Sequence, residues 1–243
     1  MNNQTVLVTG AANGIGRALT LVLLSEGSKV LACDNDGTGL ESLRDETDSQ
    51  NLFIYVADLS KTSQIKEFWE WVESNHPNVS SLINNAGVYH GKPYLDYSKL
   101  EADEAIALNL TTPLFLSEQF SKHIIEHGRT GSVVNVTSVA GEVGSSDAIY
   151  GSTKAALIGL TKSHAMNFGP KIRVNAVSPA AVRETAIFDL IPEYRRKEYL
   201  RQEYLDSPIT PQSVAAVILF LIGDSSKNIT GKTIPVDNGC YPR

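Results

Sequence analysis

The chain is poor in cysteine, has no long hydrophobic run and carries no excess of positive charge. Two cysteines in 243 residues, Cys33 and Cys240, are too few for a disulfide framework, and this favours a cytoplasmic protein. No apolar stretch reaches the roughly 18 residues of a membrane-spanning helix, and no signal peptide is expected. The net charge of −6 argues against binding to nucleic acid or to an anionic membrane, which need a basic surface. His, Cys and Asp nowhere show metal-ligand spacing, so we expect no metal.

Short apolar runs alternate with helix-length amphipathic segments along the chain. Strands are expected at 5–9, 29–33, 52–56, 81–84, 132–137, 172–178 and 233–236. Helices are expected at 15–26, 38–48, 62–75, 99–127, 149–168 and 211–223. Several strands are continuous apolar runs, which is typical of strands covered on both faces. The alternation predicts an α/β fold with a doubly wound parallel sheet of about seven strands, flanked by helices, in a single domain over 1–243.

A glycine-rich segment, TGAANGIG (9–16), follows the first predicted strand and opens the first helix. Gly10, Gly14 and Gly16 permit a tight turn and a close backbone approach, and a helix N-terminus offers free N–H groups to a pyrophosphate. A glycine-rich turn on its own can be only a turn. Its position between strand and helix favours a dinucleotide site.

The second predicted strand ends in Asp34, about 20 residues past this loop, where an acidic residue accepts hydrogen bonds from an adenosine ribose. A carboxylate there would repel a 2′-phosphate. No basic residue lies at 35–37, and Arg17 is one turn into the helix, poorly placed to compensate. The pattern therefore predicts NAD and not NADP, with a solvated strand-end Asp as the alternative.

Tyr150 and Lys154 stand four residues apart in AIYGSTKAAL (148–157), twelve residues after Ser138. On a helix they would share one face. Taken alone, the pair also fits a surface helix with a solvent-exposed lysine.

Together these motifs make the chain resemble the short-chain dehydrogenase/reductase family. The resemblance rests on TGAANGIG, Asp34, ADL (57–59), NNAG (84–87), Asn109, Ser138, YGSTK (150–154), RVNAVSP (173–179) and ITGKTIPVDNG (229–239). They follow the family order from residue 9 to residue 239. The resemblance implies a Rossmann fold and an oxidoreductase that transfers a hydride between NAD and a small-molecule secondary alcohol or ketone.

The resemblance also assigns roles. Tyr150 would be the acid/base, with its pKa brought down by the adjacent ammonium of Lys154, which would also hold the nicotinamide ribose. Ser138 would bind the substrate oxygen, and Asn109 would lie in a helix that joins Lys154 to solvent through a water. The cofactor would be bound by Gly10, Asn13, Gly14, Ile15, Gly16, Asp34, Asp58, Leu59, Asn85, Ala86, Gly87, Tyr150, Lys154 and Val182.

Three segments depart from the family pattern. The loop between Ser138 and Tyr150 is one residue short, so Ser145 or Ser146 is a candidate for a hydroxyl in the substrate site. Pro179 is followed by Ala180 instead of Gly, and Glu184 stands where the family has a Thr near the nicotinamide amide, with Thr185 one place later. Asn238 replaces a Gly near the C-terminus.

The substrate lid is expected at about 183–210, which is rich in Arg, Lys, Glu and Tyr. The segment is either a solvated helix with ion pairs, or one of its Arg or Tyr side chains contacts a polar or acidic substrate. Tyr89, His90 and Tyr94 follow the fourth strand and are further candidates for the pocket.

An NADPH-dependent ketone or 3-oxoacyl reductase is the alternative enzyme. A non-catalytic cofactor-binding or regulatory protein on the same scaffold is the alternative of another class. The resemblance further implies a homotetramer or homodimer that pairs the helices at 99–127 and 149–168.

Overall fold

The computed structural model describes residues 4–240, and in this range the strands form one seven-stranded parallel sheet. Its order is β3-β2-β1-β4-β5-β6-β7. The strands are β1 (Thr5–Thr9), β2 (Lys29–Asp34), β3 (Leu52–Val56), β4 (Val79–Asn84), β5 (Gly131–Val136), β6 (Ile172–Pro179) and β7 (Thr233–Val236). The doubly wound α/β fold expected from the sequence is confirmed. Residues 1–3 and 241–243 of the expected domain lie outside the described residues.

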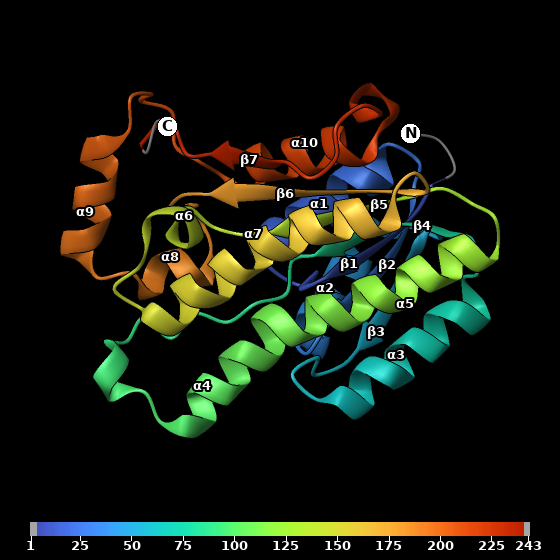
Figure 1. The fold of residues 1–243 in the computed structure, drawn as a ribbon, viewed down its shortest axis with the longest axis horizontal. Coiled ribbons are helices and arrows are strands. Elements are labelled where there is room, and N and C mark those ends of the chain that lie inside the picture. The colour runs from blue at the N-terminus through green and yellow to red at the C-terminus, as the bar shows by residue number, and fades with distance from the viewer. Residues whose placement is uncertain (1–3, 241–243) are drawn as a thin grey trace.

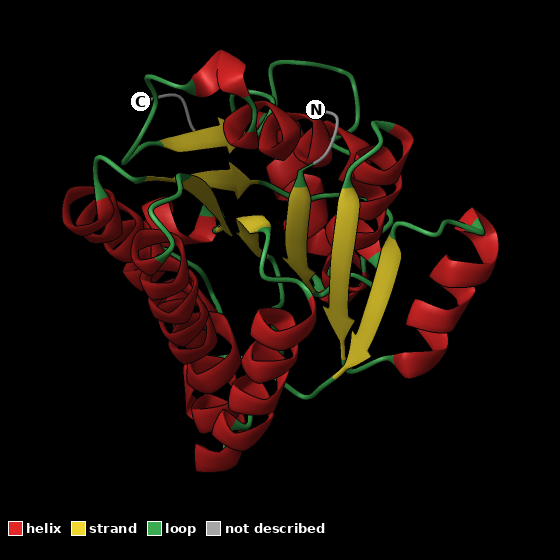
Figure 2. Ribbon diagram, turned by 90° about the vertical axis from the view of Figure 1, so that its right-hand side faces the viewer, coloured by secondary structure: helices red, strands yellow, loops and turns green. Residues whose placement is uncertain are grey.

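Helices cover both faces of this sheet (Figures 1 and 2). They are α1 (Gly14–Ser25), α2 (Gly37–Thr47), α3 (Thr62–Asn75), α4 (Lys99–Ile106), α5 (Thr112–Glu126), α6 (Ala140–Val143), α7 (Ala148–Phe168), α8 (Ala186–Leu190), α9 (Glu193–Gln202) and α10 (Pro211–Ile222). Figure 1 shows α3, α5 and α7 in front of the sheet, with α1 and α10 behind it and α9 at its left margin.

Two apolar clusters hold these layers together. Because successive residues of a strand point to opposite faces, Val6 and Val8 of β1 join a buried cluster with α1, α2 and α10, whereas Leu7 joins a second one with α3 and α5. Phe68 and Phe120 are the largest fully buried side chains and belong to the second cluster. Burial on both faces explains why the strand sequences are continuous apolar runs.

The junction of β1 and α1 is packed too closely for side chains. A Cβ atom on Gly16 would lie 1.9 Å from the carbonyl oxygen of Gly10, and one on Gly10 would lie 2.8 Å from Nδ2 of Asn85. Gly10 also has a positive φ of 67°, which favours glycine. The glycines thus bring the start of α1 directly against the end of β1.

The predicted helices match the structure closely, except that the expected helix at 99–127 is divided. A π-helical turn over Ala107–Thr111 separates α4 from α5. The short helices α6 and α8 lie in segments where the sequence pattern predicted no helix, whereas α9 lies in the lid, for which a solvated helix was one of the two interpretations. These segments surround the candidate site.

Candidate active site

A cavity of about 490 Å³ lies at the carboxyl ends of the central strands. Because parallel strands end at one edge of the sheet, the loops after them converge there. Most of the residues proposed from sequence line this cavity: Gly10, Asn13, Gly14, Ile15, Asp34, Asp58, Leu59, Asn85, Ala86, Gly87, Ser138, Tyr150, Lys154 and Val182. Gly16 and Asn109 do not line it and lie behind its wall. Gly16 was expected to bind cofactor, but its missing side chain is required by packing against Gly10.

The glycine-rich loop presents an open helix N-terminus to the cavity. Asn13, which precedes α1, makes no side-chain capping hydrogen bond to it and instead donates to Asp36 at 3.1 Å. First-turn N–H groups of a helix have no partner within the helix. The start of α1 therefore remains available to an anionic ligand, and these residues fit the pyrophosphate of a dinucleotide.

Asp34 stands at the end of β2 and is oriented by backbone N–H groups. One carboxylate oxygen accepts from Ala12 N at 2.9 Å and the other from Asp36 N at 3.0 Å. Arg17, in the first turn of α1, makes its contacts elsewhere: it pairs with Glu46 and donates to the carbonyl of Ala12. No basic residue of the described chain lines this end of the cavity to offset the carboxylate.

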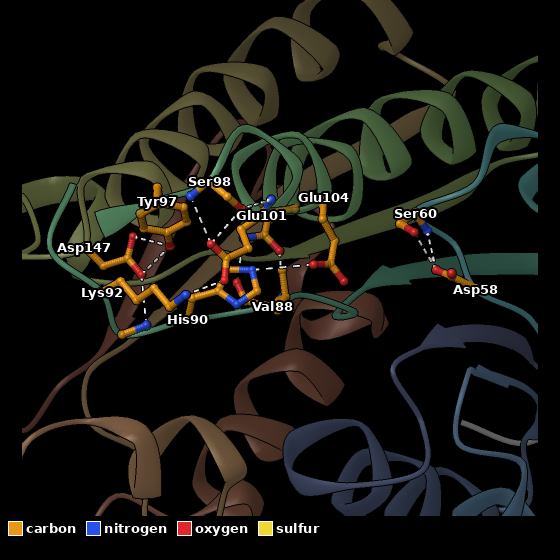
Figure 3. A network of polar contacts seen from close by, with 12 residues as sticks. Asp58, Ser60, Val88, His90, Lys92, Tyr97, Ser98, Glu101, Glu104 and Asp147 are labelled. Atoms are coloured by element: carbon orange, nitrogen blue, oxygen red, sulfur yellow. Dashed lines mark hydrogen bonds and ion pairs between the residues drawn. The ribbon is translucent and has the colours of Figure 1, made fainter. Parts of the chain in front are cut away.

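Asp58 and Leu59 border the same end after β3. The Asp58 carboxylate accepts from the backbone N–H of Ser60 at 3.0 Å and from its hydroxyl at 2.6 Å (Figure 3). These hydrogen bonds lower the pKa of Asp58. Asp58 is therefore a charged, fixed group at the cavity rim.

Tyr150, Lys154 and Ser138 converge at the other end of the cavity. Tyr150 and Lys154 lie one turn apart on α7, both buried, with Nζ of Lys154 5.6 Å from the centre of the phenol ring. Ser138 follows β5, and its hydroxyl lies close enough to Tyr150 to lower the pKa of the phenol. The surface-helix interpretation of this pair is wrong, because both side chains point into the protein.

The electrostatics of Tyr150 differ from the expectation. Burial raises its pKa to about 12, against a lowering effect of Ser138, and Tyr89 and Asp147 raise it further. The ammonium of Lys154 lies over the ring instead of at the hydroxyl, so it does not overcome the loss of hydration. The protein by itself thus holds Tyr150 as a neutral phenol.

Burial also affects the charge of Lys154. Its Nζ donates to the carbonyl oxygen of Val136 at 2.8 Å, and burial lowers its pKa to about 8. Near neutral pH the ammonium form still predominates. The site therefore contains a cation beside an uncharged phenol.

Asn109 lies in the π-helical turn and is completely buried. Its Oδ1 accepts from Val88 N at 2.7 Å, and its Nδ2 donates to Val88 O at 2.9 Å and to Thr153 at 3.3 Å. It therefore fastens the loop after β4 to α7. A π-helical turn is a frequent feature of functional sites.

The departures near β6 and β7 are accommodated by the backbone. Ala180 has no positive φ, whereas Glu184 has a φ of 62° and points to solvent. This left-handed residue turns Thr185 into the cavity, where its hydroxyl donates to Val182 O at 2.8 Å. Thr185 and not Glu184 thus occupies the site. Asn238 adopts a left-handed φ of 51°, in which asparagine is tolerated.

The wall beyond Tyr150 is mostly apolar and comes largely from segments without a clear sequence signal. Tyr89 lines it, with its ring edge-on to Tyr150 at 5.0 Å. His90 and Tyr94 do not: His90 pairs with Glu104, and Tyr94 is largely exposed. Ser145 lines the cavity and Ser146 does not. The sequence analysis did not single out Val139, Ala140, Val143, Ala186, Ile187, Phe188, Ile191 and Cys240, which also line the cavity.

In the expected lid, the aromatic residues that reach the cavity are Phe188 of α8 and Tyr199 of α9. Arg183, Arg195, Arg196, Lys197 and Arg201 do not line it. Arg195 pairs with Glu198 and Lys197 with Glu193, one turn along the helix. Most of the charge in this segment therefore belongs to the solvated face of α9.

The fold and site define a nicotinamide-dependent oxidoreductase scaffold, and comparison with known proteins agrees. Residues 10–241 match the family model described as enoyl-(acyl carrier protein) reductase. The 3-oxoacyl-acyl-carrier-protein reductase FabG of Thermotoga maritima is 35% identical, over 98% of each chain. The 7alpha-hydroxysteroid dehydrogenase of Bacteroides fragilis is 33% identical, over 98% of this chain and 94% of that one.

A solved structure of 4-hydroxyisoleucine dehydrogenase complexed with NADH superposes with a TM-score of 0.91 at 30% identity, covering 99% of this chain and 100% of that one. The chain belongs to the short-chain dehydrogenase/reductase family, as the sequence motifs implied. Within residues 4–240, no helix is long and apolar enough to cross a membrane, and no three His, Cys, Asp or Glu side chains gather as a metal site.

The depressed pKa of Lys154 predicts a pH-dependent contribution to stability. Between pH 8 and 10.5 the folded protein binds fewer protons at this site than the unfolded chain, so stability rises with pH there. Relative to Lys154→Met, wild type should gain about 2 kcal/mol of unfolding free energy between pH 7.5 and 10. Denaturant unfolding at both pH values measures this. Lys162→Met, on the exposed face of α7, is the control and should show no such gain. If the gain of wild type were the same relative to Lys154→Met and relative to Lys162→Met, it would not come from the burial of Lys154.

Proposed function

We propose that the protein is an NAD-dependent oxidoreductase that transfers a hydride between nicotinamide and a secondary alcohol or ketone. The observation that carries this proposal is the common cavity: the open start of α1 borders one end, and Ser138, Tyr150 and Lys154 border the other. When bound, the nicotinamide supplies or accepts the hydride. The protein supplies the position of the reactants and the proton.

In reduction, Tyr150 donates its phenolic proton to the carbonyl oxygen, which Ser138 holds by a hydrogen bond. The raised pKa of Tyr150 keeps this proton in place near neutrality. In oxidation, the proton must first leave, and the positive charge of Lys154 favours the phenolate. Lys154 also holds the nicotinamide ribose. Asn109 holds the loop after β4 against α7 through hydrogen bonds to Val88 and Thr153.

The cofactor preference follows from Asp34. Its carboxylate is oriented by Ala12 and Asp36, lies within the cavity lining and has no cation there to neutralise a 2′-phosphate. Such a group accepts hydrogen bonds from a ribose diol and repels NADP. The similar 4-hydroxyisoleucine dehydrogenase was solved in complex with NADH, which agrees with this preference.

The substrate end favours an uncharged reacting group. Val143, Phe188, Ile191, Tyr89 and Tyr199 form most of its wall, and the basic residues of the lid do not reach it. An apolar wall does not compensate the dehydration of a carboxylate. Neutral ketones and secondary alcohols with an apolar group beside the reacting carbon therefore fit best.

A 3-oxoacyl reductase that uses NADPH is the second candidate, because the Thermotoga maritima relative is named for that reaction. A binding protein without turnover is disfavoured by the intact set of Ser138, Tyr150 and Lys154. We also propose a homotetramer or homodimer, since Leu100, Leu114 and Met166 leave apolar surface exposed on α4, α5 and α7.

Replacing the phenolic hydroxyl tests the reaction. Tyr150→Phe should lower kcat/KM at least about 100-fold, because it removes the proton donor and keeps the ring. A panel of secondary alcohols and ketones, with matched neutral and carboxylate-bearing members, would be assayed by NADH absorbance. Tyr94→Phe, on the surface, should leave the rate unchanged. If the wild type turned over no member, or if Tyr150→Phe matched it, the proposed function would fail.

Cofactor titration tests the role of Asp34. The wild type should bind NADH more tightly than NADPH in a fluorescence titration, and Asp34→Ser should lower that ratio at least tenfold, about 1.4 kcal/mol. Asp45→Asn on the exposed face of α2 makes the same change in net charge away from the site and should leave the ratio unchanged. Tighter binding of NADPH by the wild type would contradict this assignment and favour the second candidate.

A further inference from the structure

A buried carboxylate stands at the start of the catalytic helix. Asp147 precedes α7, three residues before Tyr150, and only 1% of its surface is exposed. Among residues 4–240 no lysine, arginine or histidine forms an ion pair with it; the nearby pairs join His90 to Glu104 and Lys92 to Glu101. A buried charge of this kind needs hydrogen bonds in place of water.

Three donors from two segments supply them. Tyr150 N donates to Oδ1 at 3.0 Å, and Gly91 N donates to Oδ2 at 3.1 Å. The Tyr97 hydroxyl reaches both oxygens, at 2.8 and 2.7 Å. Figure 3 shows Tyr97 and Asp147 facing each other between the loop after β4 and the start of α7. The carboxylate thus joins the segment 89–97 to the catalytic helix.

The joined segment contributes Tyr89 to the wall of the substrate end. Tyr89 packs edge-on against Tyr150, with ring centres 5.0 Å apart. Gly91 is so close to α8 that a Cβ on it would lie 3.2 Å from the carbonyl oxygen of Leu190. Asp147 therefore fixes, through one side chain, both the first turn of α7 and the wall opposite the phenol.

The charged and titratable groups around Asp147 leave its negative charge uncompensated. Tyr97 and Tyr89 face it from the segment 89–97, and Tyr150 and Lys154 lie on the helix that it precedes. From α9, the groups that act on Tyr89 are Tyr194, Arg195 and Tyr199. Burial is the main cause of the raised pKa of Tyr97, Tyr89 and Tyr150, and the charge of Asp147 adds to it in each. Lys154 is tied to Val136 and does not pair with it.

We propose that Asp147 is a positioning residue for proton transfer: its hydrogen bonds lock the segment that carries Tyr89 onto α7, and they fix a negative charge at the start of the helix that carries Tyr150. This inference rests on the proposed function of Tyr150. The enzyme gains a secure proton donor for reduction and needs a higher pH for oxidation.

The test separates charge from structure. The pH profile of kcat/KM for alcohol oxidation with saturating NAD would be measured for wild type, Asp147→Asn, Asp147→Ser and Tyr97→Phe. Asn and Ser both cap helices well without charge, so at least one should fold. In either, the acid limb of the profile should move to lower pH by at least about half a unit. Tyr97→Phe removes a hydrogen bond but keeps the charge, so its limb should stay at or above the wild-type pH.

All three variants should raise KM for the substrate severalfold, since each loosens the wall. If the acid limb of the kcat/KM profile stayed at the wild-type pH in both Asp147→Asn and Asp147→Ser, the electrostatic role would be overturned. Asp147 would then act only as the N-cap of α7. An unchanged KM in every variant would overturn the positioning role. Absence of turnover in the wild type would instead remove the proposed function on which the inference rests.

Discussion

The site depends on the parallel hydrogen bonding of β1, β4, β5 and β6. Because these strands run in one direction, the residues that follow them meet at one edge of the sheet. The register is reinforced by a buried polar chain in which Asn84 of β4 donates to Asn135 of β5, and Asn135 donates to Thr161 of α7. This chain ties the strands that carry the candidate site to the helix that carries Tyr150 and Lys154. Without the common strand direction, the glycine-rich loop and the phenol would not share a cavity.

Burial is the second constraint, and it acts on both catalytic candidates in opposite directions. Loss of hydration raises the pKa of Tyr150 and lowers that of Lys154, so each group is held toward its uncharged form. The phenol retains its proton, while the lysine keeps most of its charge near neutrality. Oxidation of an alcohol therefore requires a further positive charge beside the phenol, to favour loss of its proton. The oxidised nicotinamide ring carries such a charge. Under the proposed function, the charge of Lys154 and that of the oxidised nicotinamide ring would together favour the phenolate.

The sequence predicted the fold and singled out most of the residues that line one end of the cavity, because both depend on local patterns. Strand runs are apolar on both faces, and the glycines of the first loop are required by close backbone contacts such as that of Gly16 with Gly10. The substrate end was predicted poorly, because its wall is assembled from α6, α8, α9 and the loop after β4. Thr185 enters the cavity only because Glu184 is left-handed, and Asp147 meets Tyr97 across 50 residues of chain. The sequence marked Thr185 only as a displaced residue, and the contact of Asp147 with Tyr97 has no local sequence signal.

The most direct test of the central claim is the ionisation of Tyr150 itself, which can be followed by NMR of tyrosine labelled with carbon-13 at Cζ. Tyr150→Phe identifies the resonance. The protein alone should show a pKa near 12 for this phenol, as its burial requires. With NAD bound, the pKa should fall by at least about two units, because a cationic ring then lies beside it. A pKa near 10 in both states, unaffected by NAD, would contradict the account.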